Sequence, residues 1–234
     1  MGENGICELD FEDITLTAEK TQYYKRLETL TYSSIVDKEV GYSRRYAQLS
    51  GIDPRVYITT ADASSKVEGE MEIADHCAPT AGTNMLIYLT LEKYPGLNVT
   101  DENFKDAFIL MYEQMGTKPK VGTYVSNAAT GYENVIRSMG ITKMFAEIHR
   151  SVTFYQAMDC MDDGAVHLSL RNSQIYGDHG VLGVGYISFI HSSGWVSNYY
   201  QIVDGWYDDQ YRYVNHSLGI DCIHVIDLVF VDNE

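Results

Sequence analysis

The middle of the chain carries hydrophobic positions at helical spacing. Residues 81–94 follow Ala78-Pro79-Thr80, are apolar on most sides and stop at Pro95-Gly96, which predicts a helix buried on nearly every face. A second helix is predicted from Thr100 to Gly116, where large apolar residues recur at helical spacing: Phe104, Phe108, Met111 and Met115. Two further helices are predicted around 132–139 and over 151–161.

The pattern changes after the Asp-Asp-Gly turn at 162–164. Runs rich in Val, Ile and Tyr then predict strands over 165–170, 180–190, 199–203 and 223–231. Helices first and strands afterwards are typical of an α+β domain, whereas an α/β domain alternates them.

The first 60 residues give weaker signals. The first 20 hold six acidic side chains without clear periodicity. A polar helix is predicted over 18–32, a short strand over 55–60 and a loop over 61–75. We therefore expect an N-terminal extension over 1–60, either a packing layer or a pro-region remnant, and one α+β domain over 61–234.

Charge and cysteine count narrow the function. The chain has 17 Lys and Arg against 33 Asp and Glu, a formal net charge of -16, which argues against nucleic acid as a partner. Its longest apolar runs fall short of the roughly 20 residues of a membrane helix, so no membrane span is expected. None of the four cysteines forms a C-x-x-C pair, so we expect one special thiol and three bystanders.

Cys77 is the candidate for the special thiol. It lies at the predicted N-terminus of the buried helix, where the helix dipole and free backbone N–H groups favour an anion and lower a thiol pKa. A thiolate nucleophile needs an imidazole partner. Of the seven histidines, His179 is best placed, because it follows a polar loop and opens the Gly-rich strand 180–190. An ordinary buried cysteine and a structural histidine remain the alternatives.

Asp204 is the third candidate. If 180–190 and 199–203 form an antiparallel hairpin, residue 204 faces residue 179, and its carboxylate could bond the second ring nitrogen of His179 and fix its tautomer. Trp206 would then cover the pair. The alternative is a plain Asp-Gly turn.

Three segments together resemble the papain-like cysteine peptidase superfamily and, more narrowly, its bacterial double-glycine-peptidase-like branch. They are Cys77-Ala-Pro-Thr-Ala81 at the start of the apolar helix, Gly177-Asp-His179-Gly180 and Val203-Asp204-Gly205-Trp206, in the order Cys, His, Asp. The resemblance implies a papain-like α+β fold. Its helical half carries Cys77 on a buried central helix, and its antiparallel sheet half carries His179 and Asp204.

The resemblance also implies a thiol hydrolase, a peptidase that acts on a peptide or protein substrate through an acyl-enzyme on Cys77. His179 would serve as general base and then acid, and Asp204 would orient it. The family usually places a Gln shortly before the nucleophile, as an oxyanion-hole donor. This chain has no Gln or Asn between Gln48 and Cys77, and Ala78 stands where relatives often carry Gly.

Two other functions stay open: a transglutaminase-like acyl transferase, and a catalytically weak binding or adhesion module, which nineteen tyrosines would suit. We expect no cofactor and no metal, since Cys77, His76 and His179 are poorly spaced for zinc. Asp159, Asp162 and Asp163 are expected in solvated turns. The resemblance favours a secreted or cell-surface bacterial protein with a trimmed signal, and it leaves the cytoplasm and the oligomeric state open.

Overall fold

The computed structural model describes residues 29–39, 41–217 and 220–230. The helices described are α2 (Tyr32–Lys38), α3 (Thr60–Val67), α4 (Cys77–Glu92), α5 (Lys105–Gln114), α6 (Val125–Ser138) and α7 (Phe154–Asp162), with short 3-10 turns at Pro54–Val56 and Pro95–Leu97. The strands are β1 (Tyr42–Gln48), β2 (Met144–His149), β3 (Val166–Ser173), β4 (Gly177–His191), β5 (Val196–Val203), β6 (Arg212–Asn215) and β7 (Cys222–Phe230).

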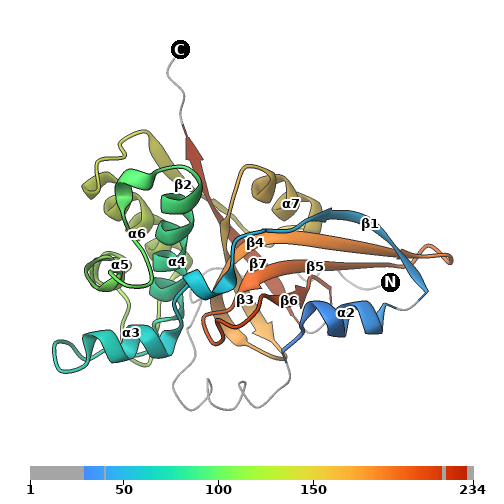
Figure 1. The fold of residues 1–234 in the computed structure, drawn as a ribbon, viewed down its shortest axis with the longest axis horizontal. Helices are drawn as coiled ribbons and strands as arrows, with labels where there is room; N and C mark the ends of the chain where they lie inside the picture. Colours follow the sequence, from blue (N-terminus) through green and yellow to red (C-terminus); the bar gives the residue numbers. More distant parts are fainter. Residues whose placement is uncertain (1–28, 40, 218–219, 231–234) are drawn as a thin grey trace.

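The strands of the described ranges join one seven-stranded sheet with antiparallel pairings, in the order β2-β7-β3-β4-β5-β6, and β1 pairs with β4 outside this order. The long strand β4 organises it. β5 pairs along one side of β4, while β3 and then β1 share the other side (Figure 1). The α+β class is therefore confirmed.

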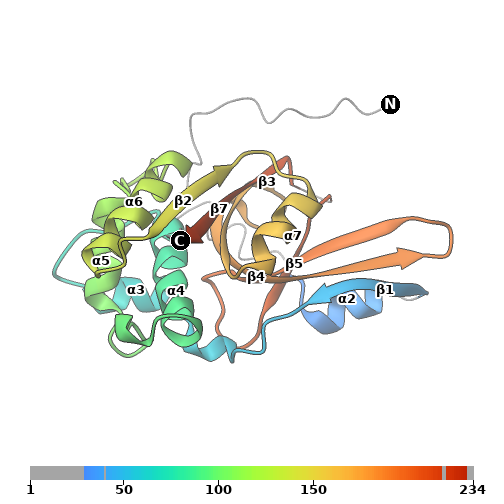
Figure 2. The same cartoon turned by 90° about the horizontal axis from the view of Figure 1, so that it is seen from above.

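The sheet separates two hydrophobic clusters. Successive strand residues face opposite sides, so Leu182 and Ile226 pack with α4, α5 and α6, while Val181 and Val225 pack with α7. Figure 2 shows α7 and the α4–α6 group as separate bodies beside the strands.

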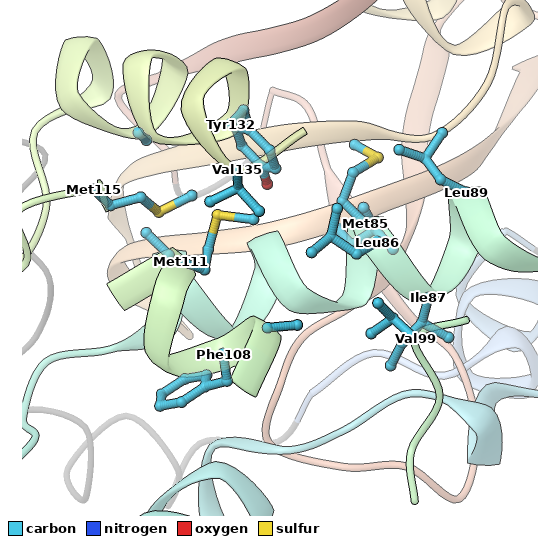
Figure 3. Close-up of a cluster of buried hydrophobic side chains, with 14 of the residues drawn as sticks. Met85, Leu86, Ile87, Leu89, Val99, Phe108, Met111, Met115, Tyr132 and Val135 are labelled. Atoms are coloured by element: carbon cyan, nitrogen blue, oxygen red, sulfur yellow. The ribbon is translucent and has the colours of Figure 1, made fainter. Parts of the chain in front are cut away.

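Helix α4 is the centre of the larger cluster. Met85 and Leu86 are fully buried, and side chains of α5 and α6, among them Phe108, Met111 and Tyr132, close over them (Figure 3). The predicted burial of this helix on most faces is confirmed, because its apolar residues occupy every side of the helix rather than one stripe.

The expected helices over 81–94, 100–116, 132–139 and 151–161 are confirmed as α4 to α7, and the four expected strands as β3, β4, β5 and β7. The strand expected over 55–60 is wrong, and the loop expected over 61–75 is wrong over 61–67 and confirmed over 68–75. The Thr59 side chain accepts from the amide of Asp62, and the Asp62 side chain accepts from the amide of Thr59, so this reciprocal capping starts α3.

Before residue 60, the described residues join the main body. β1 pairs with β4, and Ile35 of α2 packs against Ile187 and Tyr199. The helix expected over 18–32 lies largely outside the described residues, and the domain boundary at residue 60 stays a prediction. No helix among the described ranges is both long and apolar enough to cross a bilayer.

Candidate functional site

Cys77 is the first residue of α4, and no side chain caps this helix start. Its Sγ accepts a hydrogen bond from the backbone N–H of Gly180 at 3.2 Å, and the side chain is nearly buried, at 7% exposed. Helix N-termini favour negative charge, and a backbone N–H aimed at sulfur adds to that effect. The surroundings of Cys77 therefore favour a thiolate.

Gly180 allows this approach because it has no side chain. A Cβ at this position would lie 3.0 Å from two atoms of the His167 ring and 3.2 Å from Cα of Ala78. A larger residue at position 180 would therefore force its neighbours to shift by a few tenths of an ångström. With glycine there, the sulfur lies against the residue that follows His179.

His179 lies near the start of β4, and its ring contacts Asp204, the residue that follows β5. Its Nε2 lies 2.8 Å from the backbone carbonyl oxygen of Asp204, and the side chain is 4% exposed. A carbonyl only accepts, so Nε2 must carry the proton of the neutral ring, and Nδ1 carries the lone pair. The Tyr176 ring stacks on the imidazole with planes 8° apart, and the Trp206 ring lies 4.9 Å from it between centroids.

The contact between Asp204 and His179 differs from the expected one, because Nε2 bonds the backbone carbonyl of Asp204 and not its carboxylate. The buried carboxylate accepts from the amides of Trp206 and Tyr207, at 2.8 and 3.1 Å, and from the hydroxyl of Tyr176 at 3.2 Å. Burial raises the pKa of Asp204, and the two amide bonds oppose that shift. The carboxylate thus fixes the turn whose carbonyl faces His179.

Tyr176 was not singled out from the sequence, although it touches both His179 and Asp204. It is fully buried, three residues before His179, and Gly177 follows it with a φ of 67. Only a residue without a Cβ adopts that conformation freely, so the chain can turn there and bring the Tyr176 ring back over His179. A tyrosine-glycine pair just before a candidate histidine is the signal that could have revealed it.

Two other histidines near the site have structural partners. His76 shares hydrogen bonds with Ser64 Oγ at 3.0 Å and with Thr80 Oγ1 at 3.2 Å. His167 shares one with the hydroxyl of Tyr132 at 3.0 Å, and burial lowers its pKa to about 3. His167 is therefore neutral at physiological pH, and it brings no positive charge to Cys77.

The nearest amide side chains before and after Cys77 in the sequence, Gln48 and Asn84, are used elsewhere. Asn84 bonds both the amide and the carbonyl of Ile58, at 2.8 and 2.9 Å, and Gln48 donates to the carbonyl of Met161 at 3.2 Å. Backbone N–H groups at the start of α4 are thus the donors that an oxyanion at this site would meet.

The cysteines differ in state. Cys77 and Cys160 are free, whereas Cys222 is disulfide-bonded, so the expectation that Cys222 is a bystander thiol is wrong. The spacing of the cysteines in the sequence did not predict this bond, because a disulfide joins residues that are close in the fold and not necessarily in the sequence. Cys7 lies outside the described residues.

A cavity of about 320 Å³ lies beside the loop that follows Asp204. Its lining mixes basic, acidic and aromatic side chains from three segments, among them Arg55, Tyr57, Lys66, Phe104 and Asp208. Its volume is at the lower end of the range for small-ligand pockets.

Comparisons with known proteins give no family. No protein-family model and no curated protein matches the chain. A crystal structure of SERA5E from Plasmodium falciparum matches at 20% identity with a TM-score of 0.26, over 38% of this chain and 49% of that chain. The matched part spans less than half of that chain, and so low a TM-score carries no argument about fold or function. The site must be interpreted from its own geometry.

Proposed function

We propose that this protein is a papain-like thiol hydrolase that cleaves peptide bonds with Cys77 as nucleophile and His179 as general base and acid. The observation that carries the proposal is the hydrogen bond from the Gly180 amide to Cys77 Sγ at 3.2 Å, next to a histidine whose Nε2 is held by Asp204. These two contacts, at an uncapped helix start and a strand start, support the assignment of Cys77 as nucleophile and His179 as base.

In this mechanism, Nδ1 of His179 takes the proton of the Cys77 thiol. The thiolate attacks the substrate carbonyl, a C–S bond forms, and the imidazolium returns the proton to the departing amine as the C–N bond breaks. Water then attacks the acyl-enzyme with His179 as base, which releases the acid and restores the thiol. Backbone N–H groups at the start of α4 would stabilise the oxyanion.

Asp204 has an indirect role in this proposal. Its backbone carbonyl orients the imidazole and selects the tautomer that leaves Nδ1 basic. Its carboxylate holds the turn through the amides of Trp206 and Tyr207. Asp204 is therefore a positioning residue, and the rings of Tyr176 and Trp206 exclude water from the imidazole.

We further propose a secreted or cell-surface location. The disulfide at Cys222 supports it, since disulfides persist in oxidising compartments and are rare in the reducing cytosol.

Competitive alkylation tests the nucleophile, because the chain carries its own reference thiol. Iodoacetamide labelling at pH 7, followed by peptide mapping, compares Cys77 with Cys160, the other free cysteine of the described chain. We expect Cys77 to label at least about 10-fold faster, because the thiolate is the reactive form. His179→Ala should slow Cys77 alone, and His191→Ala, at the β4–β5 turn, should slow neither. Equal rates for the two thiols in wild type and in His179→Ala would contradict the proposal.

The reaction itself needs a second assay. Wild type and Cys77→Ala are incubated with a mixed peptide library, with and without a primary amine, and products are identified by mass spectrometry. Cleaved peptides from wild type alone support hydrolysis. Amine adducts would show that the protein is an acyl transferase instead of a hydrolase. Peptide binding without any product would show that it is a binding module.

A further inference from the structure

A second set of reactive side chains lies on the α7 side of the sheet, away from α4. His149 of β2, Cys160 of α7 and Asp227 of β7 each offer one ligand atom, and these three atoms lie within 4.8 Å of one another. β2 and β7 are paired neighbours, with His149 opposite Val225, and Val225 packs against α7. Three separate elements thus converge on one point.

The imidazole of this set has an unused nitrogen. Nε2 of His149 is buried and has no hydrogen-bond partner within the described ranges, and the carboxylate of Glu147 approaches it only to 3.9 Å. A buried ring nitrogen without a partner loses its hydration for no compensating bond. A ligand between His149, Cys160 and Asp227 that Nε2 coordinates would supply that bond.

The local charge is negative. The carboxylates of Asp227, Asp159 and Asp163 all act on the Cys160 thiol. Cys160 also lies in the last turn of α7, where the helix dipole is negative. These surroundings oppose a free thiolate, so Cys160 is unsuited to nucleophilic catalysis. The same negative charges favour a bound cation.

We propose that His149, Cys160 and Asp227 form a binding site for a divalent transition-metal ion, with Zn²⁺ the best match. Sulfur, imidazole nitrogen and carboxylate oxygen are the ligand types of protein zinc sites, whereas magnesium and calcium prefer oxygen alone. The set offers three protein ligands and leaves a fourth position for water or for the nearby Asp163.

The geometry is close to what zinc requires. Tetrahedral bonds of about 2.0–2.3 Å place ligand atoms roughly 3.3–3.7 Å apart. The observed spacing, within 4.8 Å, closes to that value when side chains move by about 1 Å, which rotation about χ angles provides. A bound ion would tie α7 to the β2–β7 edge of the sheet, so we expect it to stabilise the fold.

Cobalt substitution tests the site, because Co²⁺ bound to a thiolate gives a near-ultraviolet charge-transfer band that Co²⁺ on oxygen and nitrogen ligands lacks. The full chain is freed of metal with a chelator and titrated with Co²⁺, and Zn²⁺ is then added to displace it. We expect the band in wild type and in Cys77→Ser, and its loss in Cys160→Ser. Asp227→Asn should weaken Zn²⁺ binding at least 10-fold by calorimetry.

Thermal melting separates a lost site from a damaged fold. Saturating Zn²⁺ should raise the Tm of wild type and Cys77→Ser by about 5–10 °C and leave that of Cys160→Ser unchanged. The metal-free Cys160→Ser should melt close to the metal-free wild type, since serine is nearly isosteric. Absence of the band in wild type, or a band that survives Cys160→Ser and disappears in Cys77→Ser, would overturn the proposal.

Discussion

Gly180→Ala tests whether the close contact between β4 and α4 sets the reactivity of Cys77. The new Cβ would lie 3.0 Å from Cε1 and Nε2 of His167 and 3.2 Å from Cα of Ala78. Comfortable carbon contacts are about 3.5–4.0 Å, so the neighbours must withdraw by about 0.3–0.5 Å. The His167 ring is held by its hydrogen bond with Tyr132, and the contacted atom of Ala78 is its backbone Cα, so neither neighbour moves easily.

Two effects of known size follow. Overpacking a tight core costs about 1–3 kcal/mol, which lowers the Tm of a chain this long by roughly 2–12 °C. Lengthening the bond from the Gly180 amide to the sulfur removes part of a charge-assisted hydrogen bond, on the order of 1 kcal/mol. That loss corresponds to about 5-fold slower alkylation of Cys77 at neutral pH.

Gly183→Ala is the matched control, three residues along the same strand. Its Cβ would meet the end of the Met161 side chain at 2.6 Å and the Leu168 side chain at 3.0 Å, so it strains the opposite layer. Both variants are followed by thermal melting and by timed iodoacetamide labelling. We expect both to be destabilised and only Gly180→Ala to lose Cys77 reactivity. Equal labelling of Cys77 in the two variants would refute the reasoning.

Three further predictions concern the surroundings of the site. Asp204→Asn should leave Cys77 labelling within about 3-fold of wild type, because His179 is held by the backbone carbonyl; a loss on the scale of His179→Ala, about 10²-fold or more, would restore the carboxylate as the partner. Tyr176→Phe removes a hydroxyl from the buried Asp204 carboxylate and should cost about 1–3 kcal/mol in urea unfolding, and an unchanged midpoint would show that the bond is not made. His167 has its pKa lowered from 6.5 to about 3, so its stability contribution is complete above pH 6.5 and is lost as the pH falls towards 3. In His167→Gln, whose side chain can still bond Tyr132, the free energy of unfolding should fall less between pH 7 and pH 4 than in wild type, by on the order of 3 kcal/mol. Urea unfolding at both pH values measures this difference, and an identical pH dependence in the two proteins would contradict a neutral buried His167.

Apolar periodicity predicted the elements that build the core. Helix α4 was predictable because its sequence is apolar on every face, and β4 because of its long run of small and β-branched residues. β1 escaped prediction because nearly all of it is exposed, so its residues show no alternation between buried and exposed positions. The wrong strand at 55–60 arose because propensity favoured a strand where the capping pair of Thr59 and Asp62 starts a helix.

The candidate site was predictable only as far as local signals reach. Cys77 and His179 could be picked out because a helix start and a strand start are visible in sequence. The atom of Asp204 that meets His179 depends on the turn made by Asp204, Trp206 and Tyr207, which sequence does not specify. The set of His149, Cys160 and Asp227 joins residues far apart in sequence, so only the topology of β2, β7 and α7 reveals it.

Of the two thiols of the described chain that are not in a disulfide, Cys77 lies at the N-terminus of α4 and Cys160 near the C-terminus of α7, and this accounts for the different chemistry proposed for each. Cys77 begins α4, where the helix dipole is positive and the Gly180 amide donates to the sulfur, so negative charge is stabilised without a cation. Cys160 lies in the last turn of α7 among Asp159, Asp163 and Asp227, so its thiolate is favourable only with a cation bound. A single experiment that alkylates both thiols with and without Zn²⁺ should therefore separate them. We expect the metal to protect Cys160 and to leave the labelling rate of Cys77 unchanged, whereas protection of Cys77 alone would mean that zinc binds at the proposed catalytic site.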